Sequence, residues 1–176
     1  MIHYLLKKSL LIVFLLPLFA FCNTTSYSIY LAGKVRKDKE ITDMQDWRSF
    51  YAENLKRKDI KLFTPENSLE DTNDTDSIFG LDCYLIKKAD LILVNGSTKL
   101  GLGTAQEILI AKYFKKPVLI VIPPNSHNRR DLVMHGIKYQ DWIHPFLVAS
   151  TDQIVISHEK ALDVLENIEA LLSTRL

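Results

Sequence analysis

The chain has 176 residues, of which 47% are apolar and 24% are charged, as in an ordinary globular protein of one domain. Its formal net charge of +1 gives no electrostatic basis for binding a nucleic-acid polymer. Two cysteines, Cys22 and Cys83, are too few for a disulfide framework, and the C-x-x-C and H-E-x-x-H patterns of common zinc sites do not occur. We expect neither a bound metal nor a cofactor.

The N-terminus has the pattern of an export signal. Lys7 and Lys8 precede an apolar run from Leu10 to Phe21, and a polar stretch follows at 23–26. The run is short for a membrane-spanning helix, which needs about 20 apolar residues. Residues 1–22 are therefore expected to be a cleaved signal peptide, a leader lipidated at Cys22 or an uncleaved anchor. The protein would then be exported or membrane-tethered, whereas a start further downstream would leave it cytoplasmic.

The rest, 23–176, is expected to form a single domain in which strands and helices alternate. Its first half predicts a strand over 28–33 that ends in glycine, a polar loop over 34–42 and a helix over 44–58. A short strand over 61–64 stops at Pro65. An acidic segment rich in Asn and Thr, 66–77, is predicted to be a loop, and a helix follows over 78–88.

The second half continues the alternation. An apolar strand over 90–95, a helix over 104–114 and a strand over 118–122 come in succession. We expect a loop from Asn125 to about Pro145, and we expect Trp142 and Phe146 to pack on the sheet. That segment could instead cover a ligand or contact a neighbouring subunit, and it leaves His127, Arg129, Arg130 and His144 without a role. A short strand over 153–156 and an amphipathic helix capped by Ser157 complete the domain.

Alternating strands and helices predict an α/β fold with a parallel sheet covered by helices on both faces. The expected architecture is a three-layer sandwich around a five-stranded, mainly parallel sheet. In such a sheet ligands bind at the carboxyl ends of the strands. Residues that follow the strands are therefore the first candidates for a functional site.

A glycine-rich turn lies at that edge, between the strand over 90–95 and the next helix. It contains Gly101, Gly103, Thr104 and, within the first helical turns, Glu107. The small residues would let a ligand approach the backbone, and Glu107 could reach that ligand. Thr104-x-x-Glu107 also fits a capping box, in which Thr104 caps the helix and Glu107 bonds back to the backbone. The motif alone leaves both interpretations open.

A second carboxylate, Asp82, is predicted to face the same edge. It lies eight residues before Asp90, so it is about two helical turns back from the start of the strand. Paired carboxylates suit cleavage of a glycosidic bond, in which one attacks or stabilises the sugar and the other transfers protons. The alternative for Asp82 is a solvated acid on a helix face.

These motifs resemble the nucleoside 2-deoxyribosyltransferase family, which includes the deoxynucleoside 5′-monophosphate N-glycosidases. The resemblance covers roughly Ser28 to Ile122. It is carried by Ile29-Tyr30-Leu31-Ala32-Gly33, by Asp82 before Ala89-Asp90, and by Gly103-Thr104-Ala105-Gln106-Glu107-Ile108 with Ala111 and Lys116-Pro117-Val118. It implies a flavodoxin-like fold, Glu107 as the nucleophile and Asp82 as the general acid in a retaining double displacement. It also implies a nucleoside or nucleotide substrate and a homo-oligomer.

The resemblance further suggests which residues hold the substrate. Gly33-Lys34-Val35-Arg36 fits a Gly-x-x-Arg that contacts a 5′-phosphate in the monophosphate-cleaving members, and Lys99 falls near a second phosphate loop. Tyr30 would line the sugar pocket or be a core aromatic, and Asn95 would support the pocket floor or make a turn. Hydrolysis of monophosphates, or nucleotide binding without catalysis, is the alternative to deoxyribosyl transfer. An exported enzyme of this kind would act on scavenged nucleosides.

Overall fold

The computed structural model of the chain describes residues 26–34, 47–56, 59–65 and 74–173. The predicted leader, 1–22, and Arg36 lie outside these residues. Among the helices that are described, none has the length and apolar character needed to cross a membrane.

Five strands form one sheet in which every pair of neighbours is parallel. The strands are β1 (Tyr27–Ala32), β2 (Ile60–Phe63), β3 (Leu91–Asn95), β4 (Val118–Val121) and β7 (Gln153–Val155). They lie in the order β2-β1-β3-β4-β7, which is that of flavodoxin-like sheets. The predicted α/β sandwich with a five-stranded parallel sheet is therefore confirmed. The order reverses between β1 and β3, which places the expected ligand crevice at the carboxyl ends of these two strands.

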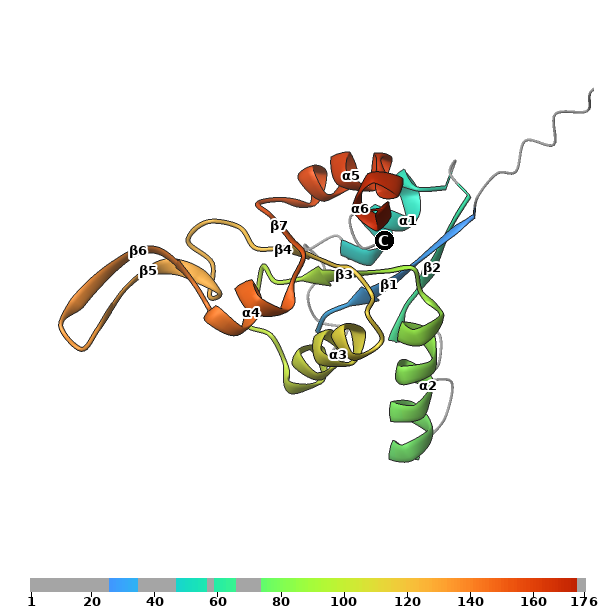
Figure 1. Cartoon of the computed structure of the whole chain (residues 1–176), viewed down its shortest axis with the longest axis horizontal. Helices are drawn as coiled ribbons and strands as arrows, with labels where there is room; N and C mark the ends of the chain where they lie inside the picture. Colours follow the sequence, from blue (N-terminus) through green and yellow to red (C-terminus); the bar gives the residue numbers. More distant parts are fainter. Residues whose placement is uncertain (1–25, 35–46, 57–58, 66–73, 174–176) are drawn as a thin grey trace, which may run out of the picture.

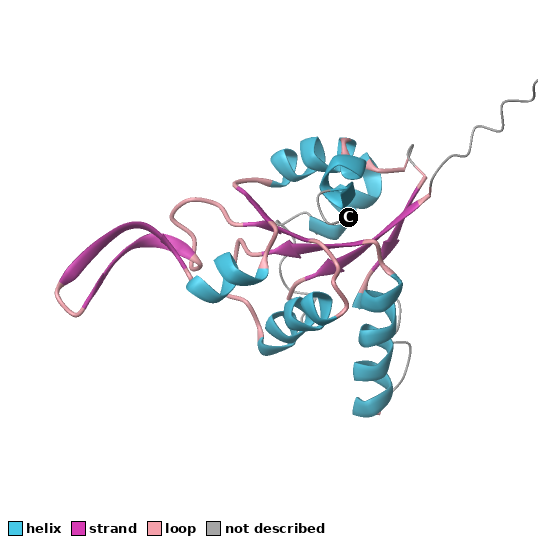
Figure 2. Cartoon of the chain, viewed as in Figure 1, coloured by secondary structure: helices cyan, strands magenta, loops and turns pink. Residues whose placement is uncertain are grey.

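Helices cover both faces of the sheet (Figures 1 and 2). One layer consists of α1 (Trp47–Asn54), α5 (His158–Glu166) and α6 (Ile168–Ser173), and the other of α2 (Thr75–Lys88), α3 (Leu102–Tyr113) and α4 (Pro145–Ser150). Alternate residues of β1 point into opposite layers. Ile29 and Leu31 pack with α1 and α5, whereas Tyr30 and Ala32 pack with α2 and α3. The central strands are apolar throughout because both of their faces are buried.

Several helix boundaries differ from the sequence prediction. The first helix, predicted to reach residue 58, ends at Asn54. The second helix begins at Thr75 rather than at 78, because Asp74 caps it by accepting a hydrogen bond from Asp76 N at 3.1 Å. The third begins at Leu102 rather than at Thr104. The final helix is divided at Asn167, the C-terminal cap of α5, after which α6 begins.

The predicted loop over 125–145 is wrong. Most of it forms an antiparallel hairpin of β5 (Arg129–Met134) and β6 (Ile137–Ile143), after which α4 begins at Pro145. Its two-residue turn, His135-Gly136, has positive φ values of 50° and 78°, as a type I′ turn requires. Figure 2 shows this hairpin projecting from the rest of the molecule. Phe146, predicted to pack on the sheet, is 79% exposed, so that prediction is also wrong.

Candidate active site

The structure brings together three side chains from three elements, between the sheet and its α2–α3 layer. Tyr30 comes from β1, Asp82 from the middle of α2 and Glu107 from the second turn of α3. Because α2 and α3 pack on the same face of the sheet, both carboxyl groups approach Tyr30 from one side. We call these residues the carboxylate cluster.

One hydrogen bond fixes the centre of this cluster. The hydroxyl of Tyr30 donates to Oε1 of Glu107 at 2.7 Å, and both residues are buried. The capping-box interpretation is therefore wrong. Gly101, rather than Thr104, is the N-terminal cap of α3, and no side chain caps the helix. Thr104 is a buried residue of the first turn, and Glu107 bonds to β1 instead of to its own backbone.

Each carboxyl group keeps one buried oxygen without a hydrogen-bond partner. In Glu107 this is Oε2, and in Asp82 it is Oδ1. A buried polar atom without a partner costs about 1–3 kcal/mol, so folded proteins rarely keep two of them close together. Two such atoms on neighbouring helices fit a site for a polar ligand, which would supply the missing partner.

Burial also changes how these groups titrate. Burial raises the pKa of Glu107 to about 7, the nearby Asp82 adds to the rise, and the Tyr30 hydrogen bond and the Arg48 charge oppose it. Burial likewise raises the pKa of Asp82, with the Tyr30 hydroxyl opposing. The pKa of Tyr30 lies far above its ordinary value because of burial and then Glu107, so its hydroxyl remains a donor. At neutral pH the cluster can therefore hold a proton on one carboxyl group and a charge on the other.

The shifted pKa of Glu107 predicts a pH-dependent stability. Between pH 4.5 and about 7 the unfolded chain loses this proton before the folded chain does, so folding of the wild type weakens as the pH rises through this range. Glu107→Gln removes the titration while keeping an acceptor for Tyr30. The variant should gain roughly 3–4 kcal/mol over the wild type between pH 4 and pH 8, since each unit of pKa shift corresponds to about 1.4 kcal/mol.

Urea denaturation at the two pH values measures this gain. Glu53→Gln, which changes an exposed carboxyl of α1, is the matched control for the loss of one carboxylate. A constant difference between Glu107→Gln and the wild type across this range would show that Glu107 titrates normally.

Arg48 is a buried charge near the cluster that the sequence interpretation missed. It is only 4% exposed, its Nη2 donates to the carbonyl of Gly33 at 3.0 Å, and its guanidinium lies over the Trp47 ring. Its charge lowers the pKa of Glu107. A signal was present in the sequence, because Arg48 shares the helical spacing of the core residues Tyr51 and Leu55.

The residues predicted to bind substrate in the loops after β1 and β3 divide into two kinds. Gly33 and Asn95 have structural roles. A Cβ at Gly33 would lie 3.0 Å from the Trp47 ring, and Oδ1 of Asn95 accepts from both N and Oγ of Ser97, which makes a turn. Lys34 and Lys99 are exposed and free to meet a ligand.

The glycines of the motif remain open to solvent. Added Cβ atoms at Gly101 and Gly103 would meet nothing within 4 Å. Nothing within the described structure therefore demands glycine at either position, although glycine in a helix costs about 1 kcal/mol relative to alanine. The interpretation that Gly101 and Gly103 allow a ligand to approach the backbone closely therefore stays a prediction.

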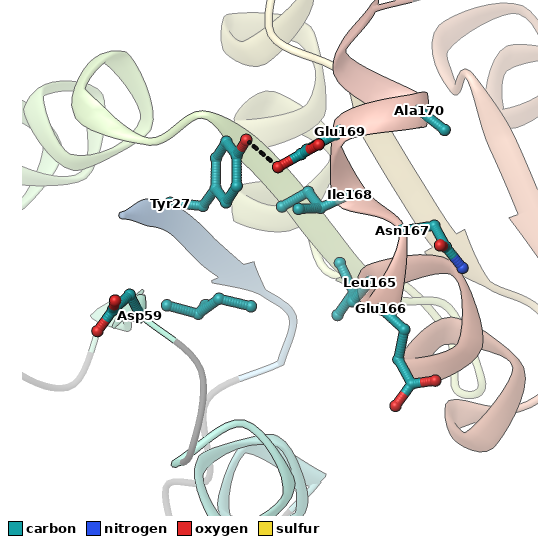
Figure 3. A pocket seen from close by; sticks show the side chains of 9 residues that line it. Tyr27, Asp59, Leu165, Glu166, Asn167, Ile168, Glu169 and Ala170 are labelled. Atoms are coloured by element: carbon teal, nitrogen blue, oxygen red, sulfur yellow. Dashed lines mark hydrogen bonds between the residues drawn. The ribbon is translucent and has the colours of Figure 1, made fainter. Parts of the chain in front are cut away.

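A cavity of about 460 Å³ lies elsewhere, at the amino ends of β1 and β2 (Figure 3). Tyr27 borders it and donates to Glu169 of α6 at 3.2 Å. The other lining residues come from the start of β2 and the α5–α6 junction: Asp59, Ile60, Leu165, Glu166, Asn167, Ile168 and Ala170. It shares no residue with the carboxylate cluster. In the described part of the chain, no three His, Cys, Asp or Glu side chains are grouped to hold a metal ion.

No protein-family model and no curated protein matches the chain. Solved structures do match. A 2-deoxyribosyltransferase from Bacillus psychrosaccharolyticus aligns with a TM-score of 0.55 at 19% identity, over 76% of this chain and 89% of that one. A 2-deoxyribosyltransferase from Leishmania mexicana aligns with a TM-score of 0.54 at 19% identity, over 78% and 95%. The chain therefore has the fold of these two enzymes.

A CMP N-glycosidase from Clostridium botulinum aligns more loosely, with a TM-score of 0.49 at 14% identity over 79% of this chain and 98% of that one.

Proposed function

We propose that the protein cleaves or transfers at the N-glycosidic bond of 2′-deoxynucleosides. The observation that carries the proposal is the carboxylate cluster, in which the buried Glu107 and the half-buried Asp82 each keep one buried carboxyl oxygen without a partner. The cluster lies near the reversal point of a sheet whose fold is that of two 2-deoxyribosyltransferases. Paired carboxyl groups are the usual means of glycosidic cleavage.

In the first step of the proposed reaction, Oε2 of Glu107 attacks C1′ of the deoxyribosyl group. The bond from C1′ to the base nitrogen breaks, and Asp82 gives its proton to the departing base. Tyr30 holds the other oxygen of Glu107 at 2.7 Å, which aims the carboxylate and leaves Oε2 for the attack. The deoxyribosyl group is then bonded covalently to Glu107.

In the second step, water or another base attacks C1′ while the carboxylate of Asp82 accepts the proton that the attacking group loses. The bond to Glu107 breaks, and the configuration at C1′ is retained after two inversions. The burial that raises the pKa of Asp82 supports its part as the proton donor at neutral pH.

Hydrolysis of deoxynucleoside 5′-monophosphates is the second candidate. It is favoured by the start of α3, where Gly101 leaves the first backbone N–H groups without a side-chain cap and Lys99 is exposed nearby. Backbone N–H groups at a helix N-terminus bind phosphate well.

The test is to incubate the full chain with the four 2′-deoxynucleosides, their 5′-monophosphates and the matching ribonucleosides, with and without a second free base. Chromatography follows the released base. Base release from deoxynucleosides supports glycosidic cleavage, a new nucleoside supports transfer, and faster release from monophosphates supports the second candidate. A folded chain that binds nucleotides saturably but releases no base would contradict catalysis and leave a binding module.

A further inference from the structure

Two of the Asp, Glu, Lys and Arg side chains are buried in the part of the chain that the structure describes. They are Arg48, which is 4% exposed, and Glu107, which is 8% exposed. A buried charge is costly unless other groups stabilise it, so folded proteins keep few of them. Glu107 belongs to the carboxylate cluster, whereas the reaction proposed above uses no group of Arg48. The burial of both side chains in one domain points to a link between them.

Arg48 approaches the edge of the sheet from the layer opposite to that of Glu107. It lies on α1, which covers one face of the sheet, whereas α3 covers the other (Figure 1). Its Nη2 donates to the carbonyl of Gly33 at 3.0 Å and its Nη1 to the carbonyl of Lys34 at 3.5 Å. Both carbonyls follow the last residue of β1, where this strand no longer separates the two layers. The guanidinium therefore lies at the carboxyl end of the strand that carries Tyr30.

Trp47 holds the guanidinium in this place. Cζ of Arg48 lies 4.7 Å from the centroid of the Trp47 ring, and the ring of His158 stacks on Trp47 with a centroid distance of 6.0 Å. A Cβ at Gly33 would lie 3.0 Å from the Trp47 ring, so a larger residue there would push the ring and Arg48 away from β1. A guanidinium fixed by two carbonyls and an aromatic ring is a preorganised charge.

Groups from three other elements act on the ionisation of Glu107. Burial and the charge of Asp82 on α2 raise its pKa, whereas the hydrogen bond from Tyr30 on β1 and the charge of Arg48 on α1 lower it. Arg48 is the positive charge among these groups. Because the resulting pKa is about 7, roughly half of the molecules carry a charged Glu107 at neutral pH. A small change in this balance has its largest effect at that pH.

We propose that Arg48 is a positioning residue of the candidate active site, which fixes the chain after β1 and keeps Glu107 in the charged form that attacks C1′. The charged form is needed because a protonated carboxyl group is a poor nucleophile. The same guanidinium thus ties the state of the nucleophile to the position of Gly33 and Lys34. This catalytic role rests on the proposed function, whereas the electrostatic link between Arg48 and Glu107 does not.

Carbon-13 NMR of the full chain, labelled at the glutamate carboxyl carbons, measures the ionisation of Glu107, and Glu107→Gln assigns its signal. Arg48→Met removes the charge, and Arg48→Lys keeps a charge on a side chain of nearly the same length as Met. Arg48→Met should raise the pKa of Glu107 by about one unit, the low end of the effect of a nearby opposite charge, and Arg48→Lys should raise it less than about half as much. Lys56→Met removes an exposed positive charge just after α1 and is the matched control, which should leave this pKa unchanged.

Base release tests the catalytic part of the proposal. The acidic limb of the pH profile of kcat/KM reports the ionisation of the free protein. In Arg48→Met this limb should move to higher pH by the shift that NMR measures, which is about a fivefold loss of kcat/KM at pH 7 that shrinks as the pH rises. Arg48→Lys should recover most of the loss. A merely structural role would lower kcat/KM equally at every pH and would leave the limb in place.

An unchanged pKa of Glu107 in Arg48→Met would overturn the proposal, and so would an equal shift in Arg48→Lys or Lys56→Met. Where Arg48→Met does not fold at neutral pH, Glu107→Gln is added to it. Recovery of folding supports the link between the two charges, and continued failure assigns Arg48 to the structure of α1 alone. Base release by the wild type without an NMR shift in Arg48→Met overturns this proposal only, whereas an NMR shift without base release by the wild type overturns the proposed function and keeps the link.

Discussion

Glu107→Gln is expected to reduce base release by at least about a thousandfold while the protein stays folded. Gln has the shape of Glu and still accepts the hydrogen bond from Tyr30, but its amide cannot form the bond to C1′. Loss of a group that forms a covalent bond to the substrate removes the double displacement, so the turnover number should fall more than the Michaelis constant changes. Base release followed by chromatography measures the loss.

The matched control is Gln106→Ala, which alters the exposed neighbour of Glu107 on the same helix. It should keep the activity within a few-fold of the wild type. A more specific test uses Glu107→Ala with added azide. Azide would attack C1′ from the space left by the side chain, with a single inversion, and would give an α-linked glycosyl azide instead of a product with retained configuration. Full activity in Glu107→Gln would show that Glu107 is not the nucleophile.

Asp82→Asn should show an effect that depends on the leaving group. The variant cannot protonate the base, so release from ordinary deoxynucleosides should fall by about a hundredfold or more, the usual contribution of general acid catalysis. In 7-methyl-2′-deoxyguanosine the base already carries a positive charge and leaves without a proton. For that substrate the loss should be less than about tenfold, after the spontaneous release is subtracted.

Asp76→Asn, at an exposed carboxyl of the same helix, is the control for this second variant and should react as the wild type does with both substrates. Equal losses for the two substrates in Asp82→Asn would mean that Asp82 positions the substrate rather than protonating the base. The two variants together separate attack on the sugar from departure of the base.

Much of the fold could be predicted from the sequence, because its strands are buried on both faces and their apolar runs stand out. The run from Leu91 to Val94 and the run from Val118 to Val121 are the clearest cases. The errors in the helix boundaries came from polar residues at the helix ends. At Thr75, the helix start is indicated only by the capping residue Asp74, which adjoins a segment of similar polar residues. Local chemistry there resembles that of a loop.

The candidate site was harder to predict, because its partners are far apart in the chain. The spacing of Asp82 and Glu107 suggested a shared edge, but the bond from Tyr30 joins residues 77 positions apart and decides against the capping box. Arg48 was missed because the helix over 44–58 was predicted from the spacing of its apolar residues, which takes no account of a charged residue at a core position. The hairpin was missed because His135-Gly136 lacks the Asn-Gly or Asp-Gly of common type I′ turns.

The root of the hairpin has a consequence for how this protein could change over evolution. The backbone N–H of His144 lies 3.4 Å from the carbonyl of Asn128, so the chain leaves the domain and returns to it at nearly the same point. A chain segment whose two ends lie close together can lengthen, shorten or be lost without displacing β4 before it or β7 after it. Residues 129–143 therefore form an exchangeable segment, and related chains with the same five-stranded sheet are free to differ most in this part.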